Sequence, residues 1–234
     1  MPSDTLAPRP LQSILVSAKI VDAILEAIAH GRLTAGTRLR EEEIASLFAT
    51  SRAAVRAALK ALAERGVAVL QPNRGASVAS PTADEVTQTY AARALIEGAM
   101  AADLAQHITA ADIRKLREHI DAQRRTNDSG ARREHLRLMG DFHALLAALH
   151  GNPVVAETLE RLVARTSFMT ALFPPKTQVC AIDDHVALVD ALAKGDGAAA
   201  QHLASKHMMD NRARLRVALG KPTGDLRAAL LPEA

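Results

Sequence analysis

The sequence is poor in aromatic residues and in cysteine, and it has no long apolar run. One tyrosine, four phenylalanines and no tryptophan among 234 residues argue against a sugar-binding or single-strand-binding surface, because both stack their ligands on exposed rings. The one cysteine, Cys180, excludes a disulfide within the chain and fits a reducing compartment. No apolar run approaches the ~18–20 residues that a membrane span needs, so we expect no contact with a membrane.

The first ten residues, MPSDTLAPRP, are polar and rich in proline, unlike the apolar centre of a signal peptide. We therefore expect a cytoplasmic protein. Hydrophobic residues make up 48% of the chain and charged residues 24%, a globular composition that excludes the disordered and fibrous classes. At ~100–200 residues per domain, the length indicates one or two domains.

Basic residues are concentrated near the N-terminus. Residues 1–80 hold ten Lys or Arg against seven Asp or Glu, whereas residues 81–234 hold nineteen of each. A compact basic patch joined to a neutral body is typical of a phosphate-binding module attached to a ligand-binding or assembly domain. The alternative is a solvated helix face with no binding role.

The order of predicted elements in residues 11–80 is that of a winged helix-turn-helix, preceded by a flexible segment over residues 1–10. Apolar periodicity and end signals predict helices over residues 11–29, 41–49 and 52–65. Two short β-prone runs around a turn cluster at residues 71–75 then predict a hairpin. In the third helix Arg52, Arg56 and Lys60 recur every four residues, so they form one basic stripe.

No strand signal appears between residues 83 and 218, so the fold class is mainly α. We expect an all-α antiparallel helical bundle over residues 81–220 and a tail over residues 221–234. The predicted helices span residues 83–107, 110–127, 131–150, 152–172, 178–194 and 196–219, each bounded by a recognisable cap or breaker.

These features suit double-stranded DNA. A helix fits the major groove, where Arg can bond to guanine through two hydrogen bonds, and an Arg at the wing tip can enter the minor groove. The candidate DNA-binding residues are Ser51, Arg52, Arg56, Lys60, Asn73, Arg74 and Gly75.

Residues 31–78 resemble the winged helix-turn-helix of GntR-type bacterial transcription regulators. The marks include Gly31, Gly36, Leu39, Glu41, Ile44-Ala45, Ser51-Arg52, Val55-Arg56, Ala58-Leu59, Leu62, Gly66 and Asn73-Arg74-Gly75. The resemblance implies that Arg52 and Arg56 contact operator bases or phosphates. Some members carry a DNA-contacting Arg where this sequence has Glu42, so that contact is not carried over.

The C-terminal half resembles the all-helical FCD ligand domain of the FadR branch of that family. The marks are Arg93 to Glu97, Asp141-Phe142-His143, Gly151-Asn152, His185, Ala191, Gly195-Asp196, Ala200 and His207. The resemblance implies a metal held by one Asp and three histidines, and His143, His185 and His207 match the histidines. Met139 stands where the Asp is expected, and a thioether is a poor ligand for such metals.

Three interpretations of the histidines stay open: a divalent metal site, with Zn or Ni as the suited ions, a pocket that binds an anion directly, or a structural role. We expect Arg93, Met139 and His135 to line an effector site. The planar guanidinium of Arg93 suits a carboxylate clamp, although an ion pair with Glu97 is the simpler alternative.

We expect a DNA-binding transcription regulator, a repressor, that binds a palindromic operator as a homodimer and responds to a small carboxylate effector. The alternatives are a metal-dependent hydrolase and a purely architectural DNA-binding protein. The sequence has no HExxH, Gly-rich phosphate loop or GxSxG motif, so we predict that it is not an enzyme.

Overall fold

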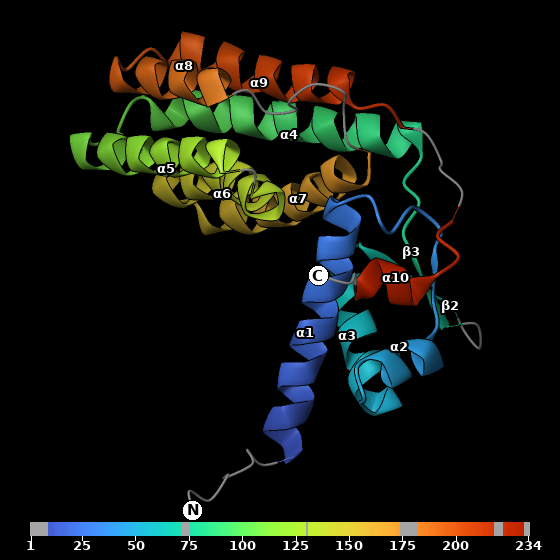
Figure 1. Ribbon diagram of the computed structural model, residues 1–234. Helices are drawn as coiled ribbons and strands as arrows, with labels where there is room; N and C mark the ends of the chain where they lie inside the picture. The colour runs from blue at the N-terminus through green and yellow to red at the C-terminus, as the bar shows by residue number, and fades with distance from the viewer. Residues whose placement is uncertain (1–8, 72–74, 130, 174–181, 218–221, 232–234) are drawn as a thin grey trace, which may run out of the picture. The chain divides into compact units, whose positions relative to one another are not determined.

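The computed structural model describes residues 9–71, 75–129, 131–173, 182–217 and 222–231. The chain divides into two compact units (Figure 1). Residues 1–80 and 219–234 form the first unit, and residues 81–218 form the second.

The first unit is a winged helix-turn-helix, as predicted. Its helices are α1 (Arg9–Ala29), α2 (Glu41–Leu47) and α3 (Arg52–Glu64), and its strands are β1 (Arg38–Leu39), β2 (Ala68–Gln71) and β3 (Gly75–Val78). The antiparallel sheet has the order β1-β3-β2, with Leu70 opposite Ala76 in the wing. Strand β1 was not predicted, because two residues are too short to show an alternating pattern. It pairs with β3, with Arg38 opposite Ser77.

Helix α3 has an apolar face and a basic face. The Ser51 hydroxyl accepts a hydrogen bond from the Ala54 backbone N–H at 3.3 Å and so caps the helix. One side of α3 is buried in the core, through Ala54, Val55, Ala58, Leu59 and Leu62. The basic stripe therefore lies on the exposed side.

The segment expected to be a tail contains a further helix, α10 (Leu226–Leu230), which packs on α1 and α2. Leu226, Ala229 and Leu230 are buried there. Arg32 Nε donates to the Ala229 carbonyl at 3.0 Å. The Thr223 backbone N–H donates to Thr37 Oγ1 at 2.9 Å, and the Thr223 hydroxyl donates to the Arg32 carbonyl at 2.8 Å. Residues 226–230 are thus part of the core of the first unit.

We predict that Leu230→Ala destabilises the first unit by about 2–4 kcal/mol, because it removes a buried side chain from a packed site. Leu231→Ala is the matched control, since Leu231 is 40% exposed whereas Leu230 is 4% exposed. Amide hydrogen exchange of α1 and α2 in the full-length protein measures the difference. Equal exchange in the two variants would show that α10 does not stabilise this unit.

The second unit is all-helical, as predicted. Its helices are α4 (Ala83–Leu104), α5 (Ala110–Asp128), α6 (Arg132–His150), α7 (Pro153–Leu172), α8 (Ile182–Ala193) and α9 (Gly197–Arg214). Thr82 and Thr109 begin α4 and α5 with capping boxes. The predicted start at residue 178 lies outside the described residues. Helix α9 ends five residues before the expected position, because the backbone turns extended at Leu215, which is buried in the core.

Helix α4 is central in this unit: α9 packs along one side of it, and α6 and α7 contact it as well (Figure 1). Helices α4 and α9 run antiparallel and very close. A Cβ added at Gly98 would overlap Ser205 Oγ, and the Ser205 hydroxyl donates to the Ala94 carbonyl at 3.0 Å. Glycine at this crossing lets the middle of α4 approach the helix that carries His207.

Candidate nucleic-acid interface and metal centre

The exposed stripe of α3 lies in a groove of the first unit with both basic and acidic walls. The lining residues are Arg38, Arg40, Glu41, Glu42, Glu43, Arg52, Arg56, Leu59, Lys60, Leu70, Gln71 and Gly75. Arg38 and Arg40 were not among the candidates from the sequence, because they precede α2 and belong to no periodic segment. Their presence extends the basic surface from α3 to the strand beside it.

Two glutamates of α2 pair with the arginines of α3. Glu42 forms an ion pair with Arg52, and Arg56 Nε lies 3.7 Å from Glu41 Oε2. The side chains of Arg52 and Glu42 are 57% and 75% exposed, so the pair contributes little to stability. Its consequence is electrostatic: a phosphate that approaches Arg52 must compete with a carboxylate.

The structure describes two of the four other candidate DNA-binding residues, Ser51 and Gly75. Ser51 has the structural role of capping α3. Gly75 begins β3 with φ of +78°, a left-handed conformation that favours glycine. Asn73 and Arg74 lie outside the described residues.

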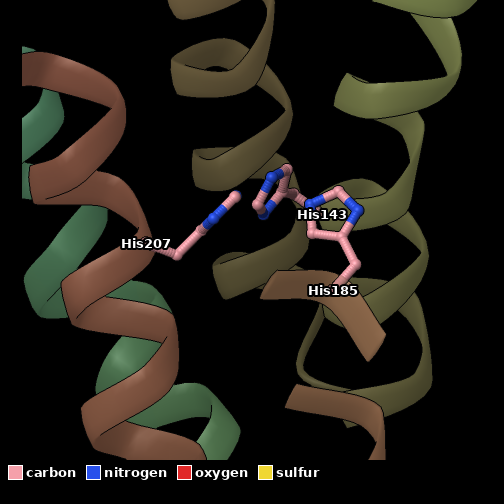
Figure 2. Close-up of side chains that lie close together, drawn as sticks. All are labelled: His143, His185 and His207. Carbon is pink, nitrogen blue, oxygen red and sulfur yellow. The ribbon is translucent and has the colours of Figure 1, made fainter. Parts of the chain in front are cut away.

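In the second unit, the three histidines named from the sequence lie together. His143 comes from α6, His185 from α8 and His207 from α9, and their rings point toward one another (Figure 2). Their ring centroids are 4.9–5.5 Å apart, and one nitrogen from each lies within 4.8 Å of the others. All three residues are at most 4% exposed.

Each of these rings has its Nδ1 atom hydrogen-bonded to a side-chain oxygen. His143 Nδ1 lies 2.6 Å from Glu97 Oε2, and His185 Nδ1 lies 3.0 Å from Gln123 Oε1. His207 Nδ1 lies 3.0 Å from Asp184 Oδ2. Phe142 stacks on His185 with a centroid distance of 3.9 Å. The three rings are therefore held in defined orientations.

The partners also determine which nitrogen carries the proton. Gln123 Nε2 donates to the Leu138 carbonyl at 3.1 Å, so its oxygen is the atom that faces His185. Hydrogen bonding with His207 outweighs partial burial and lowers the pKa of the Asp184 carboxyl, so this group is ionised and accepts. With an ionised Glu97 as well, every Nδ1 is a donor. In the neutral rings, Nε2 then holds the lone pair.

The ionisation of Glu97 follows from its surroundings. Burial alone would raise its pKa, but the positive charge of Arg93 and the hydrogen bond with His143 lower that pKa to about 2. Arg93 Nε donates to Glu97 Oε1 at 2.6 Å, and Arg93 Nη1 donates to Thr166 Oγ1 at 2.6 Å. Arg93 Nη2 is buried and has no hydrogen-bond partner among the residues that the structure describes.

The remaining effector candidates, Met139 and His135, are both on α6. Met139 is buried on α6, one turn before His143. His135 is half-buried, and its Nδ1 lies 3.3 Å from the Gln123 carbonyl and from Thr126 Oγ1, outside the histidine cluster. Gln123 and Asp184 were not among the residues predicted from the sequence. The only signal for either was the position of Asp184 directly before His185.

The donor set fits a divalent metal. Three imidazole nitrogens suit Zn²⁺ or Ni²⁺, and metal-binding histidines characteristically donate their other N–H to a carboxylate or a carbonyl oxygen. Each ring has one such oxygen partner: Glu97 for His143, Gln123 for His185 and Asp184 for His207. Three protein nitrogens leave at least one coordination position for an oxygen.

Comparison with known families decides the class of protein. A model described as bacterial regulatory proteins, gntR family, matches residues 16–78, and the FCD domain model matches residues 88–210. The chain belongs to the GntR family of transcription regulators and carries an FCD domain. It is a DNA-binding transcription regulator and not an enzyme, so the hydrolase alternative is not favoured.

Similar proteins carry the same assignment. The chain is 28% identical over 200 residues to the HTH-type transcriptional repressor RspR of Escherichia coli K12, covering 83% of this chain and 86% of that protein. It is 26% identical over 194 residues to a probable D-xylose utilization operon transcriptional repressor of Paenarthrobacter nicotinovorans, covering 82% and 85% of the two chains.

Solved structures support the fold. Escherichia coli McbR/YncC superposes with a TM-score of 0.67 at 18% identity, covering 85% of this chain and 95% of that chain. A putative GntR regulator from Rhodococcus sp. RHA1 gives 0.68 at 23% identity, covering 84% and 95%. No helix in the described part of this GntR-family chain is long and apolar enough to cross a membrane.

We predict that Glu42→Gln raises operator affinity about two- to fivefold at low salt, because Arg52 no longer has to exchange a carboxylate for a phosphate. Glu26→Gln, on α1 and outside the groove lining, is the control for the same change in net charge. Fluorescence anisotropy with operator DNA at two salt concentrations measures both. Equal gains in the two variants would assign the effect to net charge rather than to the ion pair.

Proposed function

We propose that this GntR-family protein is a repressor whose FCD domain binds a divalent metal and a small organic acid. The observation that supports this proposal is the buried cluster of His143, His185 and His207, in which every Nδ1 is bonded to an oxygen, so the Nε2 atoms are the candidate ligand atoms. The relatives named as repressors support the direction of regulation.

Zn²⁺ and Ni²⁺ are the metals that the three imidazoles suit best. With a methionine at position 139, this protein lacks the acidic side chain expected one turn before His143. The Glu97 and Asp184 carboxylates compensate in part, because they place negative charge behind two of the rings. The bound metal supplies a positive charge and open coordination positions for an oxygen-bearing ligand.

Arg93 supports a carboxylate as that ligand. Its Nε and Nη1 are engaged by Glu97 and Thr166, whereas Nη2 is buried without a partner in the described chain. A buried, unsatisfied guanidinium N–H is costly, and a carboxylate would satisfy it. A ligand held by both Arg93 and the metal would bind cooperatively with the metal.

On the DNA side, we propose that a homodimer places two α3 helices in successive major-groove turns of a palindromic operator. Arg52, Arg56 and Lys60 contact bases or phosphates in this arrangement, and the wing residues Asn73, Arg74 and Gly75 contact the minor groove. The acid changes the arrangement of the two DNA-binding units within the dimer and so the operator affinity. Because it would act on chromosomal DNA, we also propose that the protein works in the bacterial cytoplasm.

We predict that the wild-type protein binds Zn²⁺, and that a suitable carboxylate raises zinc affinity by the same factor as zinc raises carboxylate affinity. His143→Ala, His185→Ala and His207→Ala should each lower zinc affinity at least about tenfold and leave operator binding of the free protein unchanged. Calorimetry with and without citrate or lactate measures both affinities, and native mass spectrometry counts metals and subunits together.

His202→Ala is the control, because His202 is an exposed histidine on α9. If the wild type binds no zinc with or without acid, the cluster is not a metal site. A monomer in native mass spectrometry would contradict the homodimer.

We predict that Arg52→Ala and Arg56→Ala each weaken operator binding by ~1–3 kcal/mol for a lost bidentate contact. Folding should be unchanged, since both side chains are exposed. Arg65→Ala is the matched control, because Arg65 is exposed at the end of α3 and outside the groove. Fluorescence anisotropy titration with a mapped operator measures the affinities. Unchanged affinity in both variants would show that α3 is not the recognition helix.

A further inference from the structure

Asn211 lies beside the histidine cluster and has one half of its amide unused. It follows His207 by one turn of α9 and is 4% exposed. Its Nδ2 atom lies 3.1 Å from His207 Nε2. Its Oδ1 atom is buried with no hydrogen-bond partner in the part of the chain that the structure describes. A buried amide oxygen without a partner is uncommon and points to a missing ligand.

The hydrogen bonds of His207 fix the orientation of this amide. Because the Asp184 carboxylate accepts from Nδ1, the Nε2 atom of the neutral ring has a lone pair and no proton. Only the NH2 group of Asn211 can bond to that lone pair. The carbonyl oxygen must then point away from the ring, which is where it is found without a partner.

A metal on His207 Nε2 reverses this preference. The lone pair of Nε2 is then directed to the cation, and an amide N–H beside a cation is repelled by it. A half-turn of the amide about its last side-chain bond exchanges the places of Nδ2 and Oδ1 without moving the backbone. The carbonyl oxygen then lies where Nδ2 is now, 3.1 Å from Nε2.

That separation is the one expected of two ligands on one ion. Two ligand atoms that each lie about 2.1 Å from a metal, at an angle of about 90° to 110°, are about 3.0–3.4 Å apart. The amide atom nearest the ring already lies within that range. The turned NH2 group, in the present position of Oδ1, is then free to donate to a water or to the acid's carboxylate.

We propose that Asn211 Oδ1 is a ligand of the metal bound by His143, His185 and His207, and that it provides the oxygen which an acidic side chain at position 139 would otherwise provide. The inference rests on the metal binding proposed above. A neutral amide oxygen binds a divalent cation more weakly than a carboxylate does, so the site keeps a demand for an anionic ligand. This demand fits an effector domain, in which the acid must add to the metal's coordination.

The test compares Asn211→Ala, Asn211→Asp and the exposed control His202→Ala in the full-length protein. Zinc calorimetry should show about a tenfold or greater loss of affinity for Asn211→Ala, a gain above wild type for Asn211→Asp, and no change for His202→Ala. The visible absorption of the Co²⁺-loaded protein reports the ligand set directly. Its bands should shift in Asn211→Ala and stay in place in His202→Ala.

Equal or tighter zinc binding by Asn211→Ala, with an unchanged Co²⁺ spectrum, would overturn the proposal and make Asn211 a competitor for His207 or a bystander. Weaker binding by Asn211→Asp would also overturn it, and this variant covers the case in which the alanine variant does not fold, because Asp has nearly the shape of Asn. Wild-type protein that binds neither zinc nor cobalt contradicts the metal site itself. Wild-type binding that is insensitive to Asn211 contradicts only the ligand role.

Discussion

The buried carboxylate of Glu97 is the constraint on which the second unit depends. An ionised carboxylate removed from water is tolerated only when positive charge and hydrogen bonds replace the solvent. Arg93 and His143 provide both, and Arg93 in turn bonds to Thr166. These four side chains belong to α4, α6 and α7, so the packing of three helices and the ionisation of one group support each other. Loss of either partner would leave the buried charge with less compensation.

Two polar atoms in the second unit, one in this network and one beside His207, are buried and unsatisfied within the described chain. Arg93 Nη2 and Asn211 Oδ1 are buried without partners among the described residues. A core selected for stability alone would bond or replace such groups, because an unsatisfied buried polar atom costs about 1–3 kcal/mol. One of these atoms is a donor on a cation and the other an acceptor next to a histidine. They are the two chemical types needed to receive a carboxylate and a metal.

Features fixed by residues close together in the sequence could be predicted, whereas contacts between residues far apart in the sequence could not. Capping boxes at Thr82 and Thr109 fix helix starts locally, so the helices of the second unit could be predicted closely. The histidines were found through resemblance. Their oxygen partners were not, because Gln123 and His185 are 62 residues apart and meet only in the folded bundle. The helix α10 was missed for a similar reason: five residues show little periodicity, and burial against α1 and α2 stabilises them.

The path of the chain connects the two units at two places rather than one. It passes from the first unit to the second after residue 80 and returns after residue 218. The returning segment follows α9, which carries His207 and Asn211, and it ends in α10, whose Leu226 and Leu230 are buried in the first unit. Leu215 is buried in the core of the second unit, and Thr223 is hydrogen-bonded to Thr37 and Arg32 in the first. The stretch of chain that carries His207 therefore continues into the helix that completes the core of the DNA-binding unit.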